Sequence, residues 1–133
     1  MTIDFDKDRG CFVCGHENSS GLQAIFNCDK ELLQSSCRLT IGSQFQGWPD
    51  IVHGGVIASL LDEACIYAGR GLAKSLVTAE LSVRYRQPVS VGQEVAVLGE
   101  VVERRRNILR VKARLEADGE LYAEADAKVF ILS

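Results

Sequence analysis

The sequence contains no apolar run long enough to cross a bilayer, so we expect no membrane-spanning segment. Its first ten residues are polar and acidic without an apolar signal region, which predicts a cytoplasmic protein. The formal net charge is only -3, which argues against nucleic acid as the main partner. Internal repeats, low-complexity segments and linkers are also missing. With 47% hydrophobic residues, we expect a single domain over residues 1–133 that can bury a proper core.

The five cysteines are odd in number and unevenly spaced, and only one CxxC pair is present. In a reducing compartment we expect thiols or metal ligands rather than disulfides. Cys11 and Cys14 have the spacing of a zinc knuckle, and a tetrahedral site could be completed from His16, Cys28 and Cys37. Because a second CxxC pair is missing, we favour a turn held by small buried thiols. A zinc-stabilised interaction protein is the lesser alternative.

The most informative stretch is Val52–Gly71, where the letters HGG precede a segment that is apolar on nearly every face. A helix that is apolar almost all round is buried in a core. Two acids, Asp62 and Glu63, interrupt this segment. An unpaired buried carboxylate is costly, so these acids either reach water at a cleft or an interface, or have a chemical task.

Alternating apolar residues and turn signals predict strands on both sides of this helix. The expected elements are strands at 22–28 and 32–41, a helix from about residue 54 to 69 or 71, and strands at 79–85, 94–103, 108–117 and 120–132. Helices often end at glycine, which sets the helix end. Asp118-Gly119 is a hairpin signal, and we expect a longer turn at Arg104–Asn107. One helix on one antiparallel sheet is a two-layer α+β domain.

Three motifs add to this pattern: CFVCG from Cys11 with GL at 21–22, FQGWPDIVHGGVIA at 45–58 leading into LDEA, and YRQP at 85–88. The order of elements resembles the hotdog fold, and the motifs resemble the phenylacetate-type (PaaI-like) acyl-CoA thioesterases of that superfamily. The resemblance implies an antiparallel sheet wrapped around one long central helix. It also implies hydrolysis of a small or medium acyl-CoA without metal or organic cofactor, by a homodimer or a dimer of dimers.

The expected chemistry centres on the helix. Backbone amides at a helix N-terminus can hold a developing oxyanion, and Gly54 and Gly55 have no side chains to block that approach. Asp62 matches the acid of the family and is our candidate base or nucleophile. It lies roughly 12 Å along the helix from Gly54, too far for both to act on one carbonyl, so we expect a site shared between two chains. Glu63, about 100° round the helix, is the rival acid.

Supporting roles are expected for three neighbours. His53 either positions the substrate or fixes the loop. Thr78 matches a position where some relatives carry a hydroxyl that orients water, although an ordinary strand threonine is the alternative. Some relatives place Asn or Gln six residues before the histidine; here Gly47 stands there. Either Gln46 substitutes for it, or the role is vacant, as in a non-catalytic hotdog protein that binds acyl-CoA or another acyl group.

Four further residues are candidates for substrate contacts. Phe45 and Trp48 are expected to line an acyl slot, with core packing as the alternative. Arg84 and Arg86 could meet the phosphates of coenzyme A because guanidinium groups suit phosphate. A solvated sheet face is the blander and preferred interpretation of both arginines.

Overall fold

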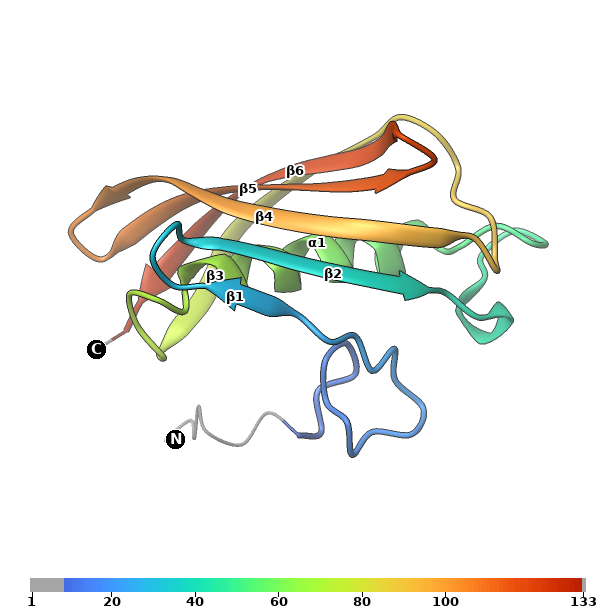
Figure 1. Ribbon diagram of the computed structural model, residues 1–133, viewed down its shortest axis with the longest axis horizontal. Helices are drawn as coiled ribbons and strands as arrows, with labels where there is room; N and C mark the ends of the chain where they lie inside the picture. Colours follow the sequence, from blue (N-terminus) through green and yellow to red (C-terminus); the bar gives the residue numbers. More distant parts are fainter. Residues whose placement is uncertain (1–8, 133) are drawn as a thin grey trace.

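The computed structural model describes residues 9–132 as an antiparallel sheet of six strands that curves around one helix (Figure 1). The elements are β1 (Asn27–Asp29), β2 (Gln34–Thr40), the 3-10 helix η1 (Ser43–Phe45), α1 (Gly54–Gly69), β3 (Leu76–Tyr85), β4 (Glu94–Arg105), β5 (Ile108–Ala117) and β6 (Glu120–Ile131). The strand order is β1-β2-β4-β5-β6-β3, so β3 is an edge strand. The predicted α+β hotdog architecture is confirmed. Within residues 9–132, no helix has the length and hydrophobicity needed to cross a membrane.

The helix α1 lies in the curve of the sheet because both surfaces are apolar where they meet. Its core-facing residues are almost inaccessible to solvent: Ile57, Leu60, Leu61, Ala64, Cys65 and Ala68. Alternate residues of β5 and β6 meet them, and many of these are alanines: Ala113, Ala117, Ala123, Ala125 and Ala127. Small side chains on the sheet let the helix backbone come close. Burial of this apolar surface is the main favourable contribution to folding.

The helix and the sheet come closest where α1 crosses β2 and β4. The Ser35 hydroxyl donates a buried hydrogen bond of 2.6 Å to the carbonyl oxygen of Ala64. Gly99 lies beside this bond, and a Cβ atom there would clash with the Ala64 carbonyl oxygen and lie 2.7 Å from the Ser35 hydroxyl oxygen. Glycine is therefore required at this position by space rather than by backbone conformation.

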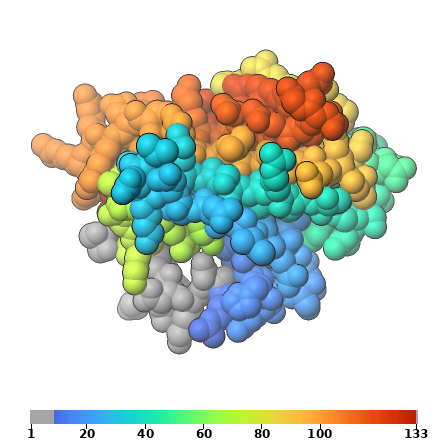
Figure 2. Space-filling model, viewed as in Figure 1, coloured from blue at the N-terminus to red at the C-terminus, as the bar shows by residue number. Residues whose placement is uncertain are grey.

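Residues 9–26 pack against α1 as an irregular segment. Val13 and Ala24 are 3% exposed and belong to the same core as α1. The Leu22 N–H donates to the Phe12 carbonyl oxygen at 2.7 Å, and the Ala24 N–H to that of Val13 at 2.8 Å. Figure 2 shows this segment in blue, lying directly against the rest of the molecule. The predicted strand at 22–28 is therefore wrong except at its end, because most of it bonds to the preceding turn rather than to the sheet.

The boundaries of α1 follow the prediction, but for a different reason at the C-terminal end. Gly69 is the last helical residue, and the cap residue Arg70 keeps right-handed helical backbone. A Cβ atom at Gly69 would lie 3.0 Å from Leu109 and 3.2 Å from Leu76. This glycine serves close packing between α1 and the sheet, and it does not form a left-handed cap.

Two of the turns predicted from local sequence signals can be compared with the structure. Asp118 and Gly119 both have positive φ angles, 51° and 76°, as expected for the predicted hairpin. The predicted four-residue turn at Arg104–Asn107 is too long, because Arg104 and Arg105 continue β4 and pair with β5. Arginine is compatible with an exposed strand end, and the sequence alone gave no stop signal inside this run.

We predict that Gly99→Ala destabilises the protein by about 1–3 kcal/mol, because the added methyl group must displace the α1 backbone or break the Ser35 hydrogen bond. Urea denaturation followed by circular dichroism measures this change. Gly10→Ala is the matched control, since a Cβ atom there meets nothing within 4 Å. The control should change the free energy of unfolding by less than about 0.5 kcal/mol. Equal stability of both variants would contradict the close contact between the α1 backbone and Gly99 of β4.

Candidate active site

A short hydrogen bond joins the helix to the edge strand. The Thr78 hydroxyl of β3 donates to Asp62 Oδ1 of α1 at 2.5 Å, and both residues are half-buried. The pairing of β3 with β6 shifts register between Thr78 and Glu80, which marks a bulge next to the threonine. Bulges re-aim side chains, and here the bulge accompanies a hydroxyl that reaches the helix. The two predicted residues Asp62 and Thr78 are therefore brought together.

The N-terminus of α1 uses most of its free amides. His53 is the N-cap residue, and its Nδ1 atom accepts a hydrogen bond of 2.9 Å from the Gly55 N–H. The Val56 and Ile57 N–H groups donate to the His53 carbonyl oxygen at 3.0 and 3.2 Å. Within residues 9–132, no hydrogen-bond acceptor is found for the Gly54 N–H. Of the two predicted oxyanion donors, Gly54 is thus the open one, and Gly55 is held by the His53 imidazole.

The loop before α1 places Gln46 away from the helix N-terminus. Gln46 Oε1 accepts a hydrogen bond of 3.2 Å from the Asp50 N–H, so the side chain stabilises its own turn. Gly47 packs against His53, because a Cβ atom at Gly47 would lie 3.2 Å from the His53 Cα atom. A longer side chain at position 47 would displace the histidine. The arrangement therefore depends on glycine at this position.

The two aromatic candidates differ in exposure. Phe45 is half-buried, and its carbonyl oxygen accepts the His53 N–H at 3.0 Å. Trp48 is 81% exposed, which is unusual for the largest apolar side chain. A substrate or another protein surface would be needed to cover it.

Tyr85 belongs to this region although its side chain was not expected here. Its hydroxyl donates a hydrogen bond of 2.7 Å to the Gly54 carbonyl oxygen, and its ring lies 3.4 Å from the place of a Gly54 Cβ atom. Tyr85 therefore holds the first turn of α1 against the end of β3. The YRQP motif contains this tyrosine, but the sequence interpretation used it only to mark the end of a strand.

The two arginine candidates lie in an ion-pair network between β3 and β6. Arg84 donates to Glu124 at 3.0 Å and to Asp126 at 3.2 Å, and Arg86 donates to Glu124 at 3.2 Å. These hydrogen bonds raise the pKa of Arg84 and lower the pKa of Glu124. Arg84, Glu124 and Asp126 also line a groove of about 390 Å³, which Asp62 and Gly54 do not line.

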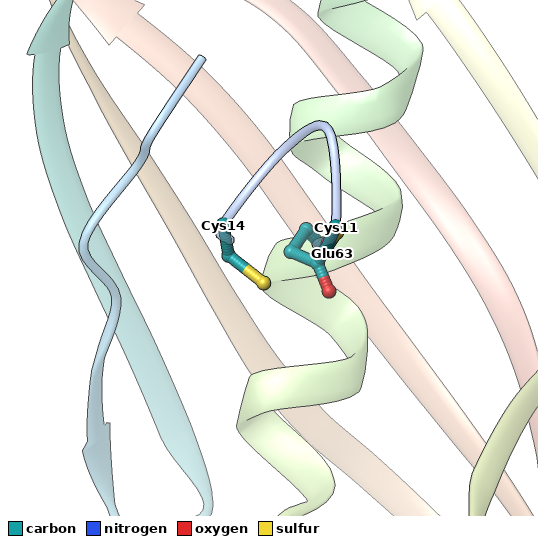
Figure 3. Close-up of side chains that lie close together, drawn as sticks. All are labelled: Cys11, Cys14 and Glu63. Carbon is teal, nitrogen blue, oxygen red and sulfur yellow. The ribbon is translucent and has the colours of Figure 1, made fainter. Parts of the chain in front are cut away.

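Glu63 points away from Asp62, toward the N-terminal segment. The Cys11 thiol lies 3.3 Å from Glu63 Oε2, and Cys14 lies beside both (Figure 3). Burial is the main reason that the pKa of Glu63 is raised, and burial also raises the pKa of the Cys14 thiol to about 12. The two adjacent acids of α1 thus have different surroundings, as their 100° separation round the helix requires.

The other predicted zinc ligands do not join this cluster. Within residues 9–132, the group of His, Cys, Asp and Glu side chains close enough to share an ion consists of Cys11, Cys14 and Glu63. His16 is exposed, and Cys28 and Cys37 belong to β1 and β2. The alternative in which these three residues complete a zinc site is therefore wrong, because the fold brings a helix carboxylate to the CxxC turn instead.

Comparison with known families places this arrangement in context. The family model described as the thioesterase superfamily matches residues 50–124, which include Asp62 and Thr78. The chain is 26% identical over 116 residues to acyl-coenzyme A thioesterase THEM4 of Bos taurus, covering 86% of this chain and 48% of that protein. It is 30% identical over 93 residues to THEM4 of Xenopus laevis, covering 68% and 42%. The chain thus spans about half the length of these curated relatives.

Solved structures share the architecture. A thioesterase superfamily protein superposes with a TM-score of 0.83 at 25% identity, covering 92% of this chain and 60% of that chain. A phenylacetic acid degradation-related protein from Ralstonia eutropha has a TM-score of 0.79 at 20% identity, covering 96% and 98%. A Streptococcus mutans protein bound to acetyl-CoA has a TM-score of 0.76 at 17% identity, covering 83% and 89%. The last two likenesses show the fold alone.

We predict that His53→Ala lowers the free energy of unfolding by about 1 kcal/mol, because the Gly55 N–H loses its capping acceptor. His53→Asn should retain most of the stability, since asparagine is a good N-cap residue. Thermal melting with calorimetry measures both variants. His16→Ala is the control at an exposed histidine. Wild-type stability in His53→Ala would show that the cap does not support the helix.

Proposed function

The chain belongs to the thioesterase superfamily, and on this premise we propose that it hydrolyses the thioester bond of a small or medium acyl-CoA. The observation that carries the proposal is the hydrogen bond of 2.5 Å between Thr78 and Asp62, which fixes an acid on the central helix beside the free edge of the sheet. Two relatives named acyl-coenzyme A thioesterase and a similar fold that binds acetyl-CoA support this substrate class.

In the proposed reaction, Asp62 takes a proton from a water molecule while the water oxygen forms a bond to the thioester carbon. The carbonyl oxygen becomes an oxyanion, which the Gly54 N–H and the positive end of α1 stabilise. The carbon–sulfur bond then breaks, and the coenzyme A sulfur leaves with its electron pair and takes the proton from Asp62. Direct attack by Asp62, followed by hydrolysis of the resulting anhydride, is the other route.

The site requires two chains. Gly54 and Asp62 are eight residues apart on one helix, which corresponds to roughly 12 Å. A second helix, antiparallel to the first, would bring its Asp62 to this chain's Gly54. The sheet allows such an arrangement, because β3 is an edge strand of ten residues. Two β3 edges from two chains can pair around a two-fold axis. We therefore propose a homodimer with two composite sites. A dimer of dimers and a cytoplasmic location stay predictions.

The loop before α1 is the proposed acyl-binding part. Trp48 is exposed in the single chain, and Phe45 is half-buried beside the helix N-terminus. A bound acyl group or the partner chain would cover the tryptophan. Gln46 has a lesser role, because its side chain oxygen is occupied by the Asp50 N–H. Arg84 and Arg86 are weak candidates for phosphate binding, since Glu124 and Asp126 already pair with them.

A second candidate function is binding of an acyl-CoA without turnover. The observation that favours it is Gly47, which leaves no side chain where some relatives carry an amide. Gln46 does not replace that amide here, because it turns toward Asp50. Such a protein would keep the fold and the acyl slot but would lack one polar contact to the carbonyl or the acid.

We predict that Asp62→Asn lowers thioester hydrolysis at least about a hundredfold, because asparagine cannot accept the proton from water. Release of free thiol from short, medium and aromatic acyl-CoAs measures the rate. The variant should keep the wild-type melting temperature, since asparagine preserves the shape of the side chain and its contact with Thr78.

Two controls accompany this experiment. Asp118→Asn changes the same residue type in a hairpin where asparagine tolerates the positive φ angle, and it should leave the rate unchanged. Glu63→Gln tests the rival acid. An unchanged rate in Asp62→Asn would remove this residue from the mechanism. Saturable binding of acyl-CoA by a wild-type protein that releases no thiol would favour the second candidate function.

We predict that two inactive variants restore activity when combined. Gly54→Pro removes the open N–H while keeping the helix start, because proline is well tolerated at the first helical position. Gly54→Ala retains the N–H and is its matched control. When Asp62→Asn and Gly54→Pro chains are co-expressed, half of the dimers are mixed, and each mixed dimer holds one intact composite site. Activity should therefore return to about a quarter of the wild-type value per chain.

Thiol release from the purified mixed population measures this recovery. Each variant alone provides the baseline, and analytical ultracentrifugation confirms that dimers are present. If Asp62 and Gly54 of the same chain formed the site, every dimer would stay inactive, and the composite site would be refuted.

A further inference from the structure

The CxxC turn and Glu63 form a cluster that the proposed hydrolysis does not use. Cys11 and Cys14 come from the N-terminal segment, and Glu63 comes from the middle of α1, 52 residues after Cys11. Figure 3 shows the turn folded over the helix, with the side chains of Cys11, Cys14 and Glu63 close together. Sequence spacing marked only the two cysteines. The fold adds a third potential ligand of a different type.

We propose that Cys11, Cys14 and Glu63 bind one divalent metal ion of the zinc class. The three ligand atoms lie within 4.8 Å of one another, and Cys11 Sγ is already 3.3 Å from Glu63 Oε2. Around a tetrahedral zinc ion, bound sulfur and oxygen atoms are about 3.6–3.8 Å apart. To hold the ion, the Cys11–Glu63 pair must therefore separate by a few tenths of an ångström, and the wider separations must close by at most about 1 Å.

The turn is built to present both sulfur atoms to one side. The Gly15 N–H donates a hydrogen bond of 2.8 Å to the Cys11 carbonyl oxygen, which closes the CxxC turn. Gly15 is buried, and a Cβ atom there would clash with the Arg9 carbonyl oxygen. Glycine after the second cysteine thus allows a tight turn around a pair of cysteines with the C-x2-C spacing of structural zinc sites.

Groups around the cluster suit a bound cation. Burial raises the pKa of the Cys14 thiol, and a hydrogen bond from Tyr67 opposes part of this rise by favouring the thiolate, which is the form that binds metal. Two thiolates and one carboxylate around a divalent ion leave one net negative charge. The positive charge of Arg70 acts on Glu63 and offsets it. Burial of charged groups is tolerated when they are paired in this way.

The fourth coordination position is not filled by a His, Cys, Asp or Glu side chain of residues 9–132. A small exogenous ligand would complete the tetrahedron. The ion would attach the N-terminal segment to α1 at the residue next to Asp62. We infer that its role is structural, because Glu63 and Asp62 point to different sides of the helix.

Metal content of the full chain tests the proposal directly. Protein expressed with added zinc and purified without chelator should contain about one zinc ion per chain by mass spectrometry. After chelation and dialysis, titration with Co²⁺ should produce the near-ultraviolet band of thiolate-to-cobalt charge transfer and the intense visible bands of a tetrahedral site. These readouts do not depend on hydrolysis, so they are independent of the proposed function.

Variants then identify the ligands. Cys11→Ser and Glu63→Gln should each weaken zinc binding at least about tenfold in competition with a chromophoric chelator. Cys28→Ser is the matched control at a half-buried cysteine outside the cluster, and it should bind as the wild type does. A second test needs no variant and so does not depend on how the variants fold. The melting temperature of the wild-type protein should be higher with bound metal than after chelation.

Three outcomes would overturn the proposal. The first is a folded wild-type protein that takes up neither zinc nor cobalt. The second is uptake that is unchanged in Cys11→Ser, which would indicate adventitious binding elsewhere. The third is a stable disulfide between Cys11 and Cys14 in protein purified under reducing conditions, since a disulfide cannot ligate the ion.

Discussion

The structure depends on one constraint, which is that α1 is apolar nearly all round and must be covered on every side. The sheet covers one side with small residues, which are alanines and Gly99. At Gly99 the backbones of the helix and the strand are in close contact. The N-terminal segment covers a second side through Val13 and Ala24. The face near the β3 edge carries Asp62, and it is there that the proposed partner chain would pack. The fold therefore follows from the need to bury one helix.

The same constraint explains the two acids in the helix. A carboxylate in such a place is costly unless it has a partner. Asp62 has the Thr78 hydroxyl, and Glu63 has the Cys11 thiol. Because consecutive helical residues point about 100° apart, neither acid can share the other's partner. The face of the helix that carries Asp62 thus meets the edge strand, and the next face contacts the N-terminal segment.

The sequence predicted the fold well because the signals for the fold are local and repeated. Alternation of apolar residues identified β4, β5 and β6, and glycines near the helix ends limited α1. The site was only partly predictable. The spacing of Asp62 from the HGG motif marked the acid, but the Thr78 hydrogen bond depends on how β3 packs. The contact of Tyr85 with Gly54 depends on how the end of β3 packs on α1, which no local pattern encodes, whereas the Gly55 cap by His53 is a local contact.

Errors arose where a segment pairs with something other than its expected partner. The segment after Gly21 has strand-like residues, yet its backbone bonds to the CxxC turn. The alternative of a zinc site completed by His16, Cys28 and Cys37 was wrong for the same reason: the carboxylate that meets the turn comes from α1. Sequence spacing reports ligands that share a turn. It cannot report a side chain supplied by the core helix, which in this fold is the element that every strand contacts.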